Sequence, residues 1–423
     1  MNGKRILFFI FLGILTLVSF VSVRFGYQNI WKMWNIPVMS PHFADLRVIT
    51  GGAESYALGD DPLYHNPRDP WGRQMNYPRI WHGLFALGIN QDHTTILGIG
   101  FIGLFFIGVF SFSREIPPMT AVILSVVTFS PAVLLGIERG NSDLIIFFLL
   151  AMAVTAGRRS GIIGIFFILS AAILKLFPAF GLSYILRETR RKILMLGALS
   201  AFLMGGYLIC TLDDLKQIRA VTPQGVVPSY GFNVLGMGLH KWLMACHFPI
   251  ATNEIVLLQY IPYALIAILF LGFLFLIFKK YDLHKHEASP DVDAFRIGAS
   301  IYIGSFMMGS NWDYRLMFLI FTVPQLVWWI RDRGTRKSYV PAVTLTGIIF
   351  SCWAMRLGLQ SYFVGFCLKN GSDWIIFAGL LYLFLTSLPE WFGEDVRRAL
   401  AYFRRIGSGT PSPAGNDAGR GSK

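Results

Sequence analysis

One carboxylate is placed where a membrane protein could use it for chemistry. Asp45 lies in the run from His42 to Arg47, about 20 residues after the first apolar stretch of the chain. Ionisable groups at membrane depth are rare and are functional by default, and a carboxylate just outside a first span is in a costly place. A single positioned carboxylate can take the proton from a hydroxyl group. We therefore predict that Asp45 is a catalytic base.

Three further polar runs interrupt the apolar sequence, and each contains a cation. They are 138–143, the segment around Lys175, and 311–315, which holds Arg315. Arginine suits bidentate phosphate recognition, and carboxylates can hold its fork in place. We predict that Lys175 and Arg315, with Arg139 as a third cation, bind a lipid-borne phosphate. The residues expected to support this site or to contact substrate are Glu138, Asn141, Asp143, Asn311, Asp313, Tyr314, Arg47 and Tyr77.

Each of these groups also has a structural interpretation that the sequence leaves open. Glu138–Arg139 and Asp313–Arg315 would serve equally as ion pairs that lock helix ends. Lys175 would extend to the interface with no ligand, and Asp45 would cap an interfacial helix. Arg47 fits a surface or supporting charge better than a ligand.

No metal or cofactor motif is present in the sequence. Four histidines in the segment 24–93 lack metal-ligand spacing. Asp60-Asp61 fits a turn better than a cation site. We therefore expect neither a metal nor a cofactor. Cys246 and Cys367 both fall in predicted external loops, and unpaired thiols are favoured over a disulfide.

Composition places the chain in the membrane. It has 423 residues, 54% of them hydrophobic, and its mean hydropathy is +0.54. Only 14% are charged, whereas soluble domains carry about 25%. Apolar stretches recur that can cross a hydrocarbon core of about 30 Å. The predicted class is an all-α polytopic membrane protein, because the alternating strands of outer-membrane barrels are missing.

The net charge of +13 does not indicate nucleic acid. Cytoplasmic loops of membrane proteins are basic, and the chain has no soluble basic domain laced with aromatic residues. Membrane lipid is the expected partner, and nucleic acid is not.

We predict about 11–13 membrane spans. A proline follows Lys175, and proline ends or kinks a helix, so 160–186 is expected to enter and return as two half-helices. The predicted spans are 5–23, 94–112, 119–137, 142–156, 160–174, 192–210, 254–278, 294–309, 315–330, 338–357 and 372–389.

Basic residues between these spans alternate onto one side, which the positive-inside rule assigns to the cytoplasm together with both termini. The loops 24–93, 211–253 and 358–371 are then external. Within the first, we expect a short helix along the membrane from Asp45 to Leu58 and a second one at 81–89.

Two regions follow from this pattern. Residues 1–390 form the membrane domain, and 391–423 form a cytoplasmic tail. The tail begins as a basic amphipathic helix suited to anionic lipid and ends in a segment rich in Gly, Ser, Pro and Asp that is expected to be disordered.

In this order, the motifs resemble glycosyltransferase family 87. Phe43-Ala44-Asp45-Leu46, Gly59-Asp60-Asp61-Pro62 and Asn76-Tyr77-Pro78 resemble its first external loop. The runs 138–143, 174–178 and 311–316 are similar to its later motifs. Arg79 departs from the family, which often has a second proline there.

The resemblance implies a C-type glycosyltransferase fold. It also implies transfer of a hexosyl group, such as mannose, from a polyprenyl-phosphate donor to a glycolipid or glycan acceptor. The expected place is the extracytoplasmic face of the cell inner (plasma) membrane. Two alternatives stay open: a lipid-linked sugar transporter or flippase, and a polysaccharide polymerase.

Overall fold

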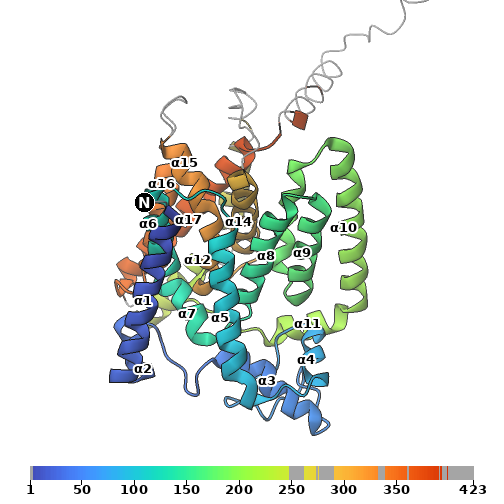
Figure 1. The fold of residues 1–423 in the computed structure, drawn as a ribbon, viewed down its shortest axis with the longest axis vertical. Helices are drawn as coiled ribbons and strands as arrows, with labels where there is room; N and C mark the ends of the chain where they lie inside the picture. The colour runs from blue at the N-terminus through green and yellow to red at the C-terminus, as the bar shows by residue number, and fades with distance from the viewer. Residues whose placement is uncertain are drawn as a thin grey trace, which may run out of the picture.

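The computed structural model describes residues 3–246, 262–272, 275, 290–331, 339–359, 362–389, 391–392 and 398. It is 76% helical with almost no sheet, and it is an all-α membrane protein. Among the described residues, three helices are long and apolar enough to cross a membrane. They are Gly3–Phe25, Gln91–Ser111 and Arg190–Cys210, labelled α1, η2 with α5, and α10 in Figure 1.

A bent pair supplies a fourth crossing. Helices α6 (Pro118–Thr128) and α7 (Pro131–Arg139) meet at an angle of 54° and pass the same test together. Pro131 explains the bend, because proline disfavours helical geometry in the residue before it. The predicted span 119–137 is therefore present as two helices.

The remaining long elements are shorter or more polar than these crossings, so only part of the predicted number of spans is shown. The predicted span 254–278 lies partly outside the described residues, and its segment Pro262–Gly272 is helical. These elements are α8 (Asp143–Gly157), α9 (Gly161–Leu174), η3 (Phe177–Arg187), α14 (Pro290–Met307), η4 (Asp313–Thr322), α15 (Val323–Arg331), α16 (Val340–Trp353) and α17 (Phe363–Thr386).

The predicted break at Lys175 is confirmed. Helix α9 ends at Leu174, and the chain reverses into the 3-10 helix η3. The hairpin closes tightly because Gly157 and Gly164 leave room for the ring of Tyr184. Lys175 therefore lies at the turn, with its backbone extended rather than helical.

Helix α17 corrects one loop prediction. The segment 358–371 was expected to be an external loop, but α17 already begins at Phe363. Lys369 and Asn370 therefore lie inside a helix and are buried. The hydrophobic run after 371 marked only the second half of this helix, because its first half carries Gly, Lys and Asn.

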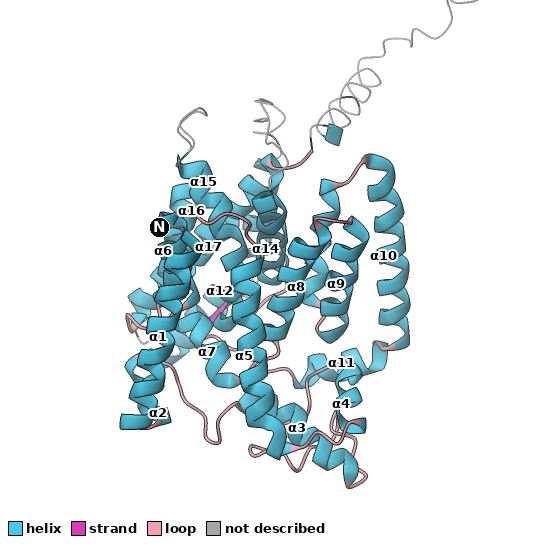
Figure 2. Cartoon of the chain, in the orientation of Figure 1, coloured by secondary structure: helices cyan, strands magenta, loops and turns pink. Residues whose placement is uncertain are grey.

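Short elements gather at one end of the molecule, at the bottom of Figures 1 and 2. The predicted helix at 45–58 is confirmed as α3, whereas the one at 81–89 is reduced to η1 and α4. The elements at or near this end are α2 (Tyr27–Met33), α3 (Ala44–Ala57), η1 (Arg79–His82), α4 (Gly83–Ala86), α11 (Leu212–Val221) and α12 (Val234–Ala245). The loops predicted to be basic and internal, after α5, between α8 and α9 and between η3 and α10, lie at the opposite end.

A two-stranded sheet joins distant parts of the chain near the site. Strand β1 (Ser229–Tyr230) pairs antiparallel with β2 (Asn311–Trp312), with Ser229 opposite Trp312 and Tyr230 opposite Asn311. The magenta strands in Figure 2 mark this pairing. The sheet fixes Asn311 at the start of η4, four residues before Arg315.

Candidate functional site

Phe43 sets the direction in which α3 leaves the preceding loop. Its backbone adopts the left-handed conformation (φ 59°), which is uncommon for a residue other than glycine. Its buried ring packs against Gly98 and Gly140, where any side chain would collide with it. Asp45 follows in the first turn of α3. The phenylalanine therefore fixes that turn against the connection between α7 and α8.

Asn141 joins the predicted base to the predicted cations. Its buried amide donates to Asp45 Oδ2 at 2.6 Å, and its Oδ1 accepts from Lys175 Nζ at 3.1 Å. The same oxygen accepts from the backbone N–H of Asp143 at 2.9 Å. These partners determine which end of the amide carries the nitrogen, because the carboxylate can only accept and the ammonium can only donate.

Asp143 brings the two cations together. Lys175 Nζ lies 2.6 Å from Asp143 Oδ1, and Arg315 Nε lies 3.5 Å from Asp143 Oδ2. The Asp143 side chain is fully buried, whereas those of Lys175 and Arg315 are 12% and 21% exposed. One carboxylate thus orients two cations, and Asp45 lies beyond Asn141 on the Lys175 side. Both cations keep donor groups available for an anion.

Aromatic rings support both cations from the side. Lys175 Nζ lies 5.0 Å from the ring centre of Tyr77, and the Arg315 guanidinium lies 4.6 Å from that of Phe177. Such cation–π contacts add to the stabilisation of a desolvated charge. Burial raises the pKa of the Tyr77 hydroxyl well above its ordinary value, and Asp45 acts in the same direction, so this group stays neutral.

The other predicted residues of the 311–315 run divide between two sites. Asn311 Oδ1 accepts from Arg315 Nη1 at 2.5 Å, and Tyr314 lies within electrostatic reach of Asp45 and Arg315. Asp313 instead pairs with Lys369 at 2.7 Å. The described ion pairs thus place Asp313 with Lys369 and Arg315 with Asp143, instead of joining Asp313 to Arg315.

Arg139 and Glu138 have the structural role that the sequence left open. They form an ion pair at 3.2 Å. Arg139 Nη2 donates to the carbonyl of Pro37 at 2.9 Å, and Glu138 Oε1 accepts from the N–H of Met39 at 3.0 Å. The pair thus fixes the loop segment that precedes α3, through the backbone of Pro37 and Met39. No described contact joins Arg139 to Lys175 or Arg315, so the prediction of a third phosphate-binding cation gains no geometric support.

Arg47 holds the first loop together. Its Nε donates to the carbonyl of His42 at 2.9 Å and its Nη1 donates to Gln91 at 3.3 Å. These bonds fit the supporting role predicted for it and do not reach the cations.

Arg73 was missed by the sequence analysis. Its Nη1 lies 3.7 Å from Asp45 Oδ1, and its Nη2 donates to the carbonyl of Ala44 at 2.6 Å. Asp69 fixes the guanidinium at 2.9 Å. The only signal was a cation four residues after an acid in the loop that contains Asp45, and irregular loops give no periodicity from which to infer a contact.

A second buried charge group, the Lys369 cluster, was also missed. It comprises Lys369, Asp313 and Asp373, with Lys369 Nζ 2.7 Å and 2.9 Å from the two carboxylates. All three side chains are 1–2% exposed. Lys369 also donates to the carbonyl of Ser229, and Ser351 donates to Asp373 at 2.6 Å. The mistaken loop at 358–371 concealed this cluster.

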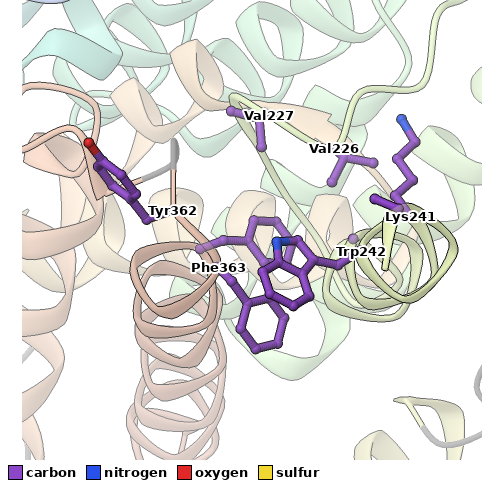
Figure 3. Close-up of a pocket in the computed structure, with 9 residues that line it drawn as sticks. Val226, Val227, Lys241, Trp242, Tyr362 and Phe363 are labelled. Carbon is purple, nitrogen blue, oxygen red and sulfur yellow. The ribbon is translucent and has the colours of Figure 1, made fainter. Parts of the chain in front are cut away.

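Two cavities lie beside these groups. An apolar one of about 410 Å³ lies between η3 and α10. A smaller one of about 200 Å³ lies between α12 and α17. The ring centres of Trp242 and Phe363 lie 4.2 Å apart there, and Lys241 also lines this cavity (Figure 3). Within the described residues, no group of three or more metal-ligating side chains occurs, and the four cysteines are unpaired.

Comparisons with known proteins give no match to a family model, to a curated protein or to a solved structure. The fold and the site define an all-α membrane protein. At one of its ends, a buried amide joins the Asp45 carboxylate to Lys175, and the Asp143 carboxylate joins Lys175 to Arg315.

Proposed function

We propose that this protein is a membrane glycosyltransferase of the C-type fold, similar to family 87. It would move a hexosyl group, with mannose the first candidate, from a polyprenyl-phosphate donor to a glycolipid or glycan acceptor. The site would face outward from the cell inner (plasma) membrane, with both termini in the cytoplasm. The observation that carries the proposal is Asn141, which holds Asp45 and Lys175 at the same amide.

The proposed reaction uses the acid and the cations for separate tasks. Asp45 accepts the proton of the acceptor hydroxyl as its oxygen forms a bond to the anomeric carbon. The bond from that carbon to the phosphate oxygen breaks, and the polyprenyl phosphate leaves with the bonding electrons. Lys175 and Arg315 stabilise the negative charge that develops on this phosphate.

The donor groups of the site support this assignment. Lys175 and Arg315 share one directly paired carboxylate, Asp143, and so keep donor groups that an anionic phosphate could take. Charge-assisted hydrogen bonds from a preorganised lysine and arginine are strong when the site is partly desolvated. We expect two protein cations to serve a monophosphate leaving group without a metal ion.

The test is transfer by the purified protein in nanodiscs. Radiolabelled polyprenyl-phosphate sugars are supplied with membrane lipid extracts, in the presence and absence of a chelator. We expect transfer from one of these donors that resists chelation. Asp45→Asn should reduce it by about 10²–10⁴-fold, the usual contribution of a general base. Asp60→Asn is the matched control, because Asp60 belongs to the same loop and pairs only with His65.

Three outcomes would overturn the proposal or part of it. Full transfer in Asp45→Asn removes Asp45 from the mechanism. Loss of transfer on chelation overturns the metal-free reaction. Movement of labelled donor across sealed vesicles, without any glycosylated product, favours the flippase alternative.

A further inference from the structure

The apolar cavity between η3 and α10 begins at the proposed phosphate site. Five of its lining residues come from one face of α10, at a spacing of one helical turn: Gly197, Ser200, Ala201, Met204 and Leu208. The opposite wall is η3, including Phe177, Phe180 and Ile185. Phe177 is the residue whose ring lies under the Arg315 guanidinium. The cavity wall and the cation site therefore share a side chain.

The direction of the cavity follows from its two ends. At the site end, Leu176 follows Lys175 directly, and the hydroxyl of Tyr207 on α10 donates to the carbonyl of Ile173 at 3.2 Å. At the far end, Gly197 faces Ile185, whose side chain would lie 3.8 Å from a Cβ added to the glycine. From Gly197 to Leu208 the groove extends about 16 Å along α10, at 1.5 Å per residue. That is about half of a hydrocarbon core of 30 Å, or one leaflet.

Helix α10 is built to stand against lipid rather than protein. Ser200 is its only buried residue, and large apolar side chains such as Leu194 (70% exposed) and Phe202 (77% exposed) face outward. A groove between such a helix and η3 opens toward the hydrocarbon region, and its lining is almost wholly apolar. An apolar chain gains free energy there by contact with walls that are denser than lipid.

We propose that this groove holds the isoprenoid chain of a polyprenyl phosphate, with the phosphate at Lys175 and Arg315. The proposal rests on the proposed function and names the place of its donor. Charge complementarity selects the occupant, because the apolar wall meets two cations with no spacer between them. A single chain attached directly to a phosphate monoester matches that arrangement.

Filling the groove tests the proposal without relying on transfer. The full chain in nanodiscs is labelled with undecaprenyl phosphate that carries a photoreactive group on its chain, and the labelled peptides are mapped. We expect labels on η3 and α10. Ala201→Trp should lower labelling by about tenfold, since it replaces the apolar contacts of the chain. Ala198→Trp, the same change at a position of α10 that does not line the cavity, should leave it intact.

Donors of different chain length, and a lipid with a different headgroup, distinguish failure of the groove from failure of the enzyme proposal. If transfer is observed, Ala201→Trp should slow a long-chain donor but spare a donor with a single isoprene unit, whose chain ends before it reaches Ala201. Transfer with labels elsewhere, or normal labelling in Ala201→Trp, overturns the groove and leaves the enzyme proposal standing. Labels in the groove without any transfer would support the lipid site and refute the enzyme. Equal labelling by a photoreactive phosphatidic acid overturns the polyprenyl occupant.

Discussion

The two charge clusters of this protein have the same kinds of groups and opposite surroundings. In the Lys369 cluster one lysine faces two carboxylates, and all three side chains are closed to solvent. In the site around Asp143 one carboxylate faces two cations, and the cations are 12–21% exposed. The first arrangement has an excess of negative charge among saturated donors. In the second, two cations share one directly paired carboxylate and keep open donors.

The difference favours a structural role for the Lys369 cluster and agrees with the phosphate site that we propose around Asp143. Every proton of the Lys369 ammonium has a partner, among Asp313, Asp373 and the carbonyl of Ser229. That cluster ties β1, η4 and α17 together. Lys175 and Arg315 have fewer fixed partners, and an anion would complete their coordination. Burial alone therefore does not separate the two clusters, whereas the number of open donor groups does.

Removal of Lys369 should have the largest effect on stability. Lys369→Met leaves two carboxylates buried without their cation, and breaking a buried pair in this way costs about 3–5 kcal/mol. Thermal unfolding of the detergent-purified protein measures it. Lys241→Met, at an exposed lysine, should have little effect. A Lys369→Met protein as stable as the wild type would show that the cluster is not structural.

Lys175→Met should have the opposite pattern of effects, with a smaller loss of stability and a large loss of transfer. Asp143 keeps Arg315 beside it, so we expect a smaller loss of stability than in Lys369→Met. Transfer should fall by about 10²-fold, the cost of one preorganised donor to a developing anion. Initial rates with a saturating donor measure the effect. If Lys175→Met unfolds as readily as Lys369→Met, the contrast between the two clusters fails.

The sequence predicts the site around Asp143 better than the Lys369 cluster for a physical reason. Asn141, Lys175 and Arg315 stand at breaks between apolar runs, where a charge is conspicuous. Lys369 lies in the polar first half of a helix, which hydropathy assigns to a loop. The break at Lys175 was also predictable, because Pro178 marks it.

The sequence predicted where charged residues lie better than it predicted which side chains they contact. Arg73 reaches Asp45 from an irregular loop, and Asp313 pairs with a residue 56 positions later in the chain. Such pairings depend on how the elements pack, and neither local spacing nor periodicity contains that information. The groove beside Phe177 likewise arises only when α10 stands against η3.

A third group of charged residues, formed by Arg79, Asp61 and Asp214, lies at the surface. Arg79 donates to Asp61 at 2.7 Å and to Asp214 at 2.9 Å, and so ties the first loop to α11. The Arg79 and Asp61 side chains are 37% and 35% exposed. Burial alone would raise the pKa of Asp61. The hydrogen bond and charge of Arg79 outweigh it, together with the N–H of Leu63, and the pKa lies below its ordinary value.

The pH dependence of this tie follows from the lowered pKa. A carboxyl group with a depressed pKa stabilises the folded state above its unfolded pKa of about 4, and that contribution is lost as the pH falls through the folded value. The protection of the amides of residues 59–79, corrected for the intrinsic pH dependence of hydrogen exchange, should therefore be high at neutral pH and lower below about pH 4. Added salt should also lower it, since exposed pairs are screened.

Arg79→Gln should have the smallest effect of the three substitutions. We expect faster exchange of the loop at neutral pH, with a loss below about 1 kcal/mol because water screens the pair. Lys216→Gln, which breaks the exposed pair with Asp213, is the control and should leave the loop unchanged. Transfer should fall far less than in Lys175→Met. An equal loss of transfer would place Arg79 within the site itself, and surface exposure would then no longer separate supporting charges from those that contact the phosphate.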